Sequence, residues 1–393
     1  MEALIRYIRS NRFELLITFF IFTNLFPYWF PKWTYYVSFI LILYKMIQYG
    51  PLGKLNITFM FLWFAVLLLI STSIGMALDL RLVIFFFILF LCAPRKSLKW
   101  HNYKKKLLYN IYVGFGIATL ANFYARLNGI NLRQDDEYMT AMGRVAEFSG
   151  FCSHPMWTAC AAALSSIFFT NMAFRRDGTG KIRRVIFFSL VLVSLYITMI
   201  SGSRSAFFIA LACIIFTVIL LSQKTATSLK YIMILGITSV FFAPILIDNS
   251  QAMMQKKNAL EITLEETSRE ELWSQRIAEF NSSPLIGIGF AAHGVGYDKM
   301  VGRNESGGSY ISVLAQAGII GMIFIILIWA SAIMLPKKVG RNPDNILIYV
   351  SFIFFSIHSI VEAYMFQPGW YLCLIVWIIV GIMIEHKQQK RLV

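Results

Sequence analysis

Arg204 is the first residue whose surroundings suggest chemistry. It lies in Ile200-Ser-Gly-Ser-Arg-Ser-Ala206, between two apolar segments. The Ser and Gly residues suit a tight turn and a helix N-cap, so we expect Arg204 to begin the next helix. Free N–H groups, the helix dipole and a guanidinium together favour binding of an anion. The alternative is an arginine at the membrane interface whose guanidinium extends into water and binds no ligand.

A second arginine, Arg276, lies in the largest polar stretch of the chain, Trp273–Gly321. Ser268-Arg-Glu-Glu271 is a capping box, which predicts a helix running to about Asn281, before Pro284 breaks it. Arg276 would lie beside the apolar stripe of this helix and point toward the membrane surface. The expected stripe consists of Leu272, Trp273, Ile277 and Phe280. Two arginines at one site would bind a phosphate or pyrophosphate; the alternative for Arg276 is a solvated helix face.

Three further residues could act in proton transfer. Glu305, just before Ser-Gly-Gly-Ser-Tyr310 and an apolar span, is a candidate general base, or it caps backbone N–H groups. His293 is a rival base with a suitable unperturbed pKa. Glu362 lies in an apolar run with His358 four residues earlier, which suggests either a functional carboxylate or a structural pair. Candidates for substrate contact alone are Arg303, Arg144 and Tyr310.

The elements that must position these residues are membrane-spanning helices. The 393 residues are 58% hydrophobic, and apolar segments near the length of a bilayer core recur throughout. We therefore expect an all-α polytopic membrane protein with about twelve spans. The predicted spans are 13–29, 34–50, 55–78, 81–94, 107–126, 155–174, 184–201, 204–222, 229–247, 309–335, 345–365 and 369–386. The span 309–335 carries Gln316, Gly318 and Gly321 and is expected to be broken, which is tolerated only against protein or a water-filled cavity.

The distribution of Lys and Arg predicts the orientation. With both termini cytoplasmic, about two thirds of the 36 basic residues fall inside. The net charge of +16 is therefore mostly a topology signal and gives no reason to expect nucleic acid. Two long loops lie outside, at 127–154 and 248–308, which divides the chain into 1–247, 248–308 and 309–393. The five Cys and five His show no metal-ligand spacing, so we expect no metal or cofactor.

Several of these segments together resemble the O-antigen ligase and O-antigen polymerase superfamily. They are Ser-Gly-Ser-Arg-Ser-Ala-Phe-Phe208, Arg276, Ser-Pro-Leu-Ile-Gly-Ile-Gly289 and Ser309-Tyr-Ile-Ser-Val-Leu-Ala-Gln-Ala-Gly-Ile-Ile-Gly321. The match covers about 197–325, and Gly143–Gly150 with His154-Pro is a looser match upstream.

The resemblance implies a GT-C-like enzyme of the bacterial inner membrane with a catalytic periplasmic loop. It would be a metal-independent glycosyltransferase whose donor is an oligosaccharide on undecaprenyl pyrophosphate. Arg204 and Arg276 match the arginines that hold the pyrophosphate in this family. Membrane lipid and a chain-length regulator protein are the other partners it implies.

This chain departs from the ligases of the family at one place. Those ligases carry a His just before the exit helix, where this sequence has Gly307 and Gly308. Glu305 or His293 would have to serve as base, or the reaction uses no strong base. The departure favours a polymerase of O-antigen, capsule or related exopolysaccharide units. The alternative is a ligase that transfers glycan to lipid A-core. A glycolipid flippase should show inverted repeats, which we do not find.

Overall fold

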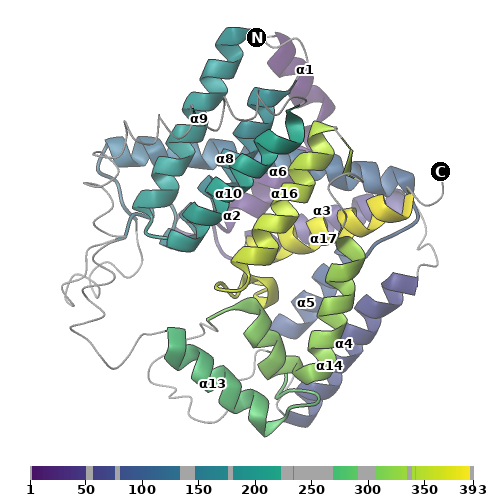
Figure 1. Cartoon of the computed structure of the whole chain (residues 1–393). Coiled ribbons are helices and arrows are strands. Elements are labelled where there is room, and N and C mark those ends of the chain that lie inside the picture. The colour runs from purple at the N-terminus through teal and green to yellow at the C-terminus, as the bar shows by residue number, and fades with distance from the viewer. Residues whose placement is uncertain are drawn as a thin grey trace, which may run out of the picture. The chain divides into compact units, whose positions relative to one another are not determined.

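The computed structural model describes residues 2–49, 56–75, 80–132, 147–175, 180–222, 233, 269–290, 307–333, 339–340 and 342–389 (Figure 1). Within these ranges every regular element is a helix. They are α1 (Glu2–Ser10), α2 (Arg12–Thr23), α3 (Thr34–Gln48), α4 (Asn56–Gly75), α5 (Leu80–Cys92), α6 (Leu98–Leu127), α8 (Pro155–Phe174), α9 (Lys181–Ile200), α10 (Arg204–Leu221), α13 (Arg269–Ser282), α14 (Ser309–Ala332), α16 (Pro343–His358), η2 (Tyr364–Phe366) and α17 (Tyr371–Gln389).

Five of these helices, α8, α9, α10, α14 and α17, are long and apolar enough to cross a membrane. Shorter apolar stretches occur at Met60–Thr72, Leu80–Cys92 and Pro343–His358. The expected class, an all-α polytopic membrane protein, is thereby confirmed. The count of about twelve spans stays a prediction, and nearly all of the expected span 229–247 lies outside the described residues.

The chain forms two compact units, each built from segments far apart in the sequence. Unit 1 comprises Met1–Thr34, Tyr109–Leu264 and Leu335–Phe354. Unit 2 comprises Tyr35–Leu108, Glu265–Met334 and Phe355–Val393. Arg204 therefore belongs to unit 1 and Arg276 to unit 2.

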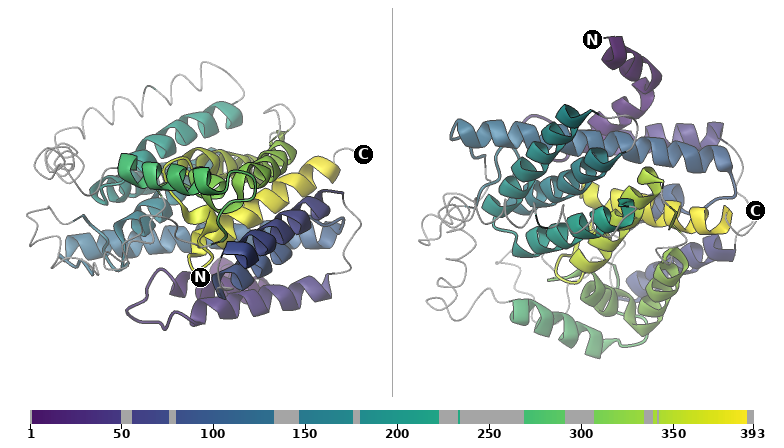
Figure 2. Two further views of the ribbon diagram at one scale, coloured as in Figure 1. Left: turned by 90° about the horizontal axis from the view of Figure 1, so that it is seen from below. Right: turned by 45° about the horizontal axis from the view of Figure 1, so that its top comes forward.

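In unit 1, α8 is the central helix, and α9 and α10 pack against it (Figure 2). Of its most apolar window 89% is buried, against 33% for α9 and for α10, so α8 is enclosed while its neighbours present a face outward. Ala161, Ala162 and Ala163 are all buried in α8. Small side chains of this kind let helices approach closely in a membrane.

In unit 2, α17 is the enclosed helix, with 83% of its apolar window buried. It packs against α5, α14 and η2. Aromatic rings fill the space between these elements: Phe85 stacks on Phe290 with 5.0 Å between ring centroids, and both lie near Phe366. This aromatic core ties the polar stretch around Phe290 to the helices.

The helix α14 is broken at Gly318, as the sequence predicted. Gly318 has φ 64° and ψ −166°, which no α-helical residue adopts. The break releases two N–H and two C=O groups, and the backbone of 284–289 satisfies all four. The bonds join Ile288 N–H to Ala315 (2.9 Å), Gly289 N–H to Gln316 (3.1 Å), Ile319 N–H to Pro284 (2.8 Å) and Ile320 N–H to Leu285 (3.2 Å). The broken backbone faces protein, which makes the break tolerable in a membrane.

The helix α16 ends earlier than the sequence predicted. It stops at His358, whereas the expected span continued to 365. Glu362 therefore lies in the turn that follows the helix and not within a span. That turn supplies the carbonyl oxygens of Ser359 and Glu362 to Ser309 at the entry of α14, so these groups are used in tertiary contacts.

Candidate functional site

Arg204 begins α10, as expected, directly after the turn Ser201–Ser203. The turn is closed by the N–H of Gly202, which donates to the carbonyl of Met199 at 3.0 Å. Ser203 occupies the N-cap position, but its side chain makes no capping hydrogen bond. Arg204 is exposed. Its guanidinium and the positive end of the α10 dipole therefore act at the same end of the helix.

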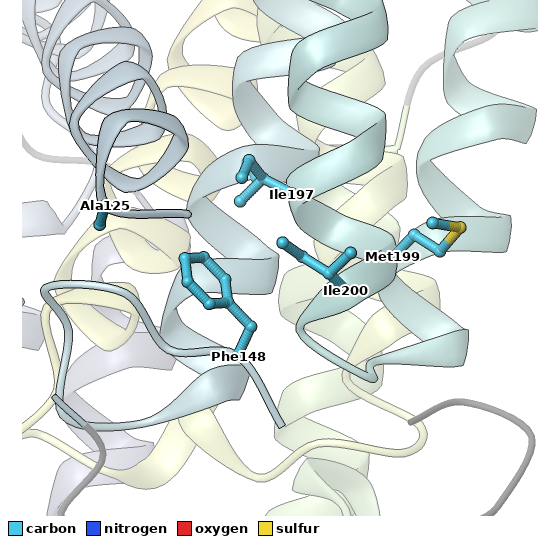
Figure 3. Packing of buried hydrophobic residues seen from close by; sticks show 6 residues of the cluster. Ala125, Phe148, Ile197, Met199 and Ile200 are labelled. Carbon is cyan, nitrogen blue, oxygen red and sulfur yellow. The ribbon is translucent and has the colours of Figure 1, made fainter. Parts of the chain in front are cut away.

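The segment after Glu147 is held tightly against this turn. The N–H of Phe148 donates to the carbonyl of Ile200 at 3.3 Å. The side-chain oxygen of Asn131 accepts from the N–H and the hydroxyl of Ser149, both at 2.9 Å. Next to the turn, apolar side chains pack into a buried cluster (Figure 3), whose members are Ala125, Phe148, Ala162, Ile197, Met199 and Ile200. The position of Glu147 is thus fixed by its neighbours.

Glu147 packs over Gly202 in the Ser-Gly-Ser-Arg turn. A Cβ at Gly202 would lie 3.1 Å from both the Cγ and the Oε1 of Glu147, and the φ of Gly202 is +73°. The side chain of Glu147 thus lies against Gly202, and Gly202 precedes Arg204 by two residues. Downstream, His154 caps α8 by accepting the N–H of Met156 at 3.1 Å, so it has a structural role.

The helix α13 forms where the capping box predicted it and lies beside α14 (Figure 1). Its expected apolar stripe is partly wrong, because Ile277 is 51% exposed. The buried positions are instead taken by Arg276, 4% exposed, and Glu279, 2% exposed. Their charged atoms, Nη1 and Oε2, are 2.7 Å apart. The contact is an ion pair without hydrogen-bond alignment, since Oε2 accepts no hydrogen bond. Glu279 thus supplies a negative charge next to the guanidinium of Arg276 in its buried position.

The entry to α14 is closed at Gly307 and Gly308. The indole N–H of Trp273 in α13 donates to the carbonyl of Gly307 at 2.8 Å. A Cβ at Gly307 would lie 2.8 Å from Trp273 Cδ1, and one at Gly308 would lie 2.3 Å from the carbonyl oxygen of Ile360. The second contact is with backbone and cannot yield by a side-chain rotation. Neither position has room for a larger residue in this arrangement.

Ser309 fixes this entry to the turn after α16. Its N–H donates to the carbonyl of Ser359 at 2.8 Å, and its hydroxyl donates to the carbonyl of Glu362 at 2.6 Å. The N–H of Met365 donates to the same hydroxyl oxygen at 3.3 Å. Ser309 is fully buried. The start of α14 is therefore rigidly placed.

Two residues of α14 carry polar groups near the site. The hydroxyl of Tyr310 donates to the carbonyl of Ser356 at 2.9 Å, which ties it to the end of α16. The role of Tyr310 in substrate binding stays a prediction. Gln316, at the break of the helix, is 7% exposed, and its Oε1 accepts no hydrogen bond. Buried acceptors in folded proteins are normally paired with a donor, so this oxygen is a candidate contact for a bound molecule.

Four predicted site residues, Glu305, His293, Arg303 and Arg144, lie outside the described residues. Among the described residues, no group of three His, Cys, Asp or Glu side chains is placed to hold a metal ion. All five cysteines are buried free thiols.

Sequence reasoning did not single out Glu147, which contacts the Arg204 turn, Glu279, which pairs with Arg276, or the buried acceptor of Gln316 as candidate functional groups. Glu147 carried a signal, since it lies in the looser upstream match and belongs to a chain with few acidic residues. Gln316 carried another, as a polar amide inside an apolar span. Glu279 had only its spacing of three from Arg276, which is common on solvated helix faces.

Residues 188–326 match the family model described as O-antigen ligase. No curated protein matches the chain at a significant level. The matched range holds the Arg204 turn, the buried Arg276, the segment 284–289 and the broken start of α14, and so covers the same motifs as the resemblance in the sequence. The match over residues 188–326 supports a relationship to the O-antigen ligase and O-antigen polymerase superfamily.

Proposed function

We propose that this protein is a polymerase of lipid-linked oligosaccharide repeat units at the periplasmic face of the inner membrane. It would transfer a glycan from one undecaprenyl pyrophosphate to the non-reducing end of another lipid-linked unit. The units would belong to O-antigen, capsule or a related exopolysaccharide. The family match supports glycan transfer in general.

The observation that carries the polymerase assignment is the closed entry at Gly307 and Gly308. A ligase of the family has a His at this place. Here a Cβ at Gly308 would lie 2.3 Å from the carbonyl oxygen of Ile360, so even Ala does not fit without a backbone shift. Trp273 fills the space at Gly307. The entry to α14 therefore has no room for a histidine side chain at either position. This supports a reaction that does not use the histidine of the ligases.

In the proposed reaction, the acceptor hydroxyl oxygen forms a bond to the anomeric carbon of the donor glycan. The bond between that carbon and the pyrophosphate oxygen breaks, and undecaprenyl pyrophosphate leaves with the electron pair. Arg204 and Arg276 would stabilise the charge that gathers on the leaving group. The proton of the acceptor hydroxyl passes to a base. Candidates for this base are Glu305, His293 and, beside the Arg204 turn, Glu147.

The burial of Arg276 adds to its suitability for this role. A guanidinium in a site with little water interacts more strongly with an anion than one in bulk solvent. Glu279 holds it in place before substrate binds. Gln316 Oε1 would accept a sugar hydroxyl and so orient the glycan near the break in α14.

The test uses the purified protein in lipid nanodiscs with lipid-linked repeat units and no added metal or nucleotide. A ladder of longer glycans is expected. Arg204→Ala and Arg276→Ala should each abolish the ladder. Lys99→Ala, which removes a charge from an exposed residue, should leave the ladder unchanged. Full activity in both arginine variants would refute the pyrophosphate role, and the absence of any ladder from the wild-type protein would refute the polymerase.

The ligase alternative is tested with a lipid A-core acceptor in the same preparation. We expect no transfer to lipid A-core by the wild-type protein. Gly308→His should not gain it, because the imidazole meets the Ile360 carbonyl and distorts the entry to α14. Transfer to lipid A-core by either protein would favour the ligase. A flippase, reconstituted in liposomes, would move labelled lipid-linked glycan from one leaflet to the other without lengthening the glycan.

A further inference from the structure

A second charged cluster lies in unit 2, away from the residues discussed so far, around Glu385 near the end of α17. Its carboxylate accepts from Lys104 Nζ at 2.6 Å and from the backbone N–H of Arg95 at 2.9 Å, both through Oε1. The other oxygen, Oε2, lies 3.1 Å from His101 Nδ1. Glu385, Lys104 and His101 are each at most 2% exposed. Both carboxylate oxygens are therefore already engaged.

Arg95, which joins α5 to α6, has a buried guanidinium whose hydrogen bonds are incomplete. The residue is 4% exposed, and its Nε and Nη2 have no hydrogen-bond partner. Its guanidinium lies over the ring of Phe90, 5.4 Å from the centroid. This cation–π contact provides no hydrogen-bond acceptor for Nε and Nη2. Burial lowers the pKa of Arg95, and Glu385 opposes this effect.

The same segment supplies a second buried donor without a partner, the indole N–H of Trp100, which is 1% exposed. The helix α6 begins at Leu98, between Arg95 and Trp100 in the sequence, so the positive end of its dipole belongs to the same short segment as these donors. Lys104 forms an ion pair with Glu385, and the guanidinium of Arg95 adds a second positive charge in the electrostatic range of the same carboxylate. The cluster thus combines excess positive charge with unused N–H groups, which is the chemistry of an anion site.

Gly381 allows α17 to approach this segment closely. A Cβ at Gly381 would lie 2.1 Å from the carbonyl oxygen of Cys92 and 3.1 Å from Lys104 Nζ. Glycine at this position therefore lets Lys104 reach Glu385. The cluster is about 20 Å along α17 from Tyr371, where the helix begins, since Glu385 comes fourteen residues later. It lies at the end of unit 2 that the Lys and Arg distribution predicts to be cytoplasmic.

We propose that Arg95, Trp100 and the start of α6 bind a phosphate group, carried by an anionic lipid headgroup or present as free phosphate. The phosphate oxygens would take up the Nε and Nη2 donors of Arg95 and the indole N–H of Trp100. The neighbouring residues favour the lipid source. The side chains of Phe90 and Leu98 are both exposed, and the ring of Phe90 contacts the guanidinium of Arg95. Acyl chains would therefore find apolar surface beside the headgroup. Basic pockets at the cytoplasmic ends of membrane helices bind lipid headgroups in this way.

The experiment measures lipid retention and thermal stability of the purified full chain, after delipidation in neutral detergent. Native mass spectrometry follows binding of phosphatidylglycerol against phosphatidylcholine, and a separate arm adds inorganic phosphate alone. Arg95→Gln removes the donors. Lys96→Gln is the matched control, because it removes the same charge from the adjacent, exposed residue.

We expect the wild-type protein to retain phosphatidylglycerol over phosphatidylcholine and to unfold at a higher temperature in its presence. Arg95→Gln should weaken this binding by about ten-fold or more, as loss of charge-assisted hydrogen bonds does, and Lys96→Gln should leave it unchanged. An Arg95-dependent stabilisation by inorganic phosphate, with none by phosphatidylglycerol, would support the site and assign free phosphate to it.

Two results would overturn the proposal. One is a wild-type protein with no preference for either phosphate source over phosphatidylcholine. The other is an equal loss of binding in Arg95→Gln and Lys96→Gln, which would mean unspecific attraction to a basic surface. If Arg95→Gln fails to fold, Trp100→Phe removes one donor at similar volume, and unchanged retention in that variant refutes the site. None of these measurements depends on glycan transfer.

Discussion

Gly287, in the segment after α13, lies directly against the backbone of Gln316 at the break in α14. A Cβ at Gly287 would lie 2.2 Å from the carbonyl carbon of Gln316. The reverse holds at Gly318, where a Cβ would lie 2.4 Å from the carbonyl carbon of Leu285. Two glycines from different segments thus let two backbones cross in contact. The crossing connects the helix that carries Arg276 to the span that follows it.

Gly287→Ala should disrupt this crossing. The φ of Gly287 is +75°, and the new Cβ meets backbone that cannot rotate away. We expect a loss of more than about 3 kcal/mol in the free energy of unfolding, because strain and overpacking add. Gly129→Ala is the control, since Gly129 has φ +68° with nothing within 4 Å. It should cost only about 1 kcal/mol. Thermal unfolding in detergent measures both, and equal losses would show that the crossing is not tightly packed.

Sequence predicted this part of the fold to a useful extent. Gln316, Gly318 and Gly321 in an apolar span indicated a break, and Ser268 with Glu271 indicated the start of α13. The four backbone bonds between 284–289 and α14 could not be foreseen, because they join segments whose register depends on tertiary packing. The periodicity of α13 also misplaced Ile277, since an ion pair occupies the buried position that an apolar side chain was expected to fill.

The two arginines should differ in what they do for stability. Arg276→Ala leaves Glu279 buried without its ion-pair partner, which should lower the free energy of unfolding by about 3–5 kcal/mol. Arg204 is exposed. Arg204→Ala should therefore change the free energy of unfolding by less than about 0.5 kcal/mol. Adding Glu279→Ala to Arg276→Ala should recover part of the loss without restoring glycan transfer. Denaturation curves and the ladder assay measure the two effects. A double variant as unstable as Arg276→Ala alone would contradict the pairing.

Cys152, in the loop that supports the Arg204 turn, should be chemically inert in the folded protein. Burial raises its pKa to about 11, although hydrogen bonds from Thr158 and Asn122 lower it. The unfolded thiol ionises from about pH 9. Between these values the unfolded state loses its proton first, so the contribution of Cys152 to stability falls as pH rises from about 9 to 11. Maleimide labelling with peptide mapping at pH 8 should modify Cys152 only after denaturation. Rapid labelling of the native protein would contradict this placement.

Some parts of the site carried too little information in the sequence to be assigned. The place of Arg204 at the start of α10 was predicted because Ser and Gly residues between two apolar segments suit a turn and a helix N-cap. Glu147 was not, because the contact between it and Gly202 arises from a hydrogen-bonded loop in which Asn131 and Ser149 fix the backbone. Single side chains set such a contact, and neither composition nor periodicity reports it.

Gly202→Ala separates the role of Glu147 from simple stability. Gly202 has φ +73°, so Ala should cost about 1 kcal/mol, close to the cost of Gly129→Ala in the same unit. The difference lies in the neighbour: the new Cβ would be 3.1 Å from Glu147 Oε1 and would push the carboxylate away from the Arg204 turn, whereas Gly129 faces open space. If Glu147 positions or activates substrate, Gly202→Ala should lose at least about ten-fold in polymer formation while Gly129→Ala does not. Glu147→Gln should show the same loss without the strain at Gly202. Equal activity of Gly202→Ala and Gly129→Ala, together with an active Glu147→Gln, would limit Glu147 to a packing role and leave proton transfer to Glu305 or His293.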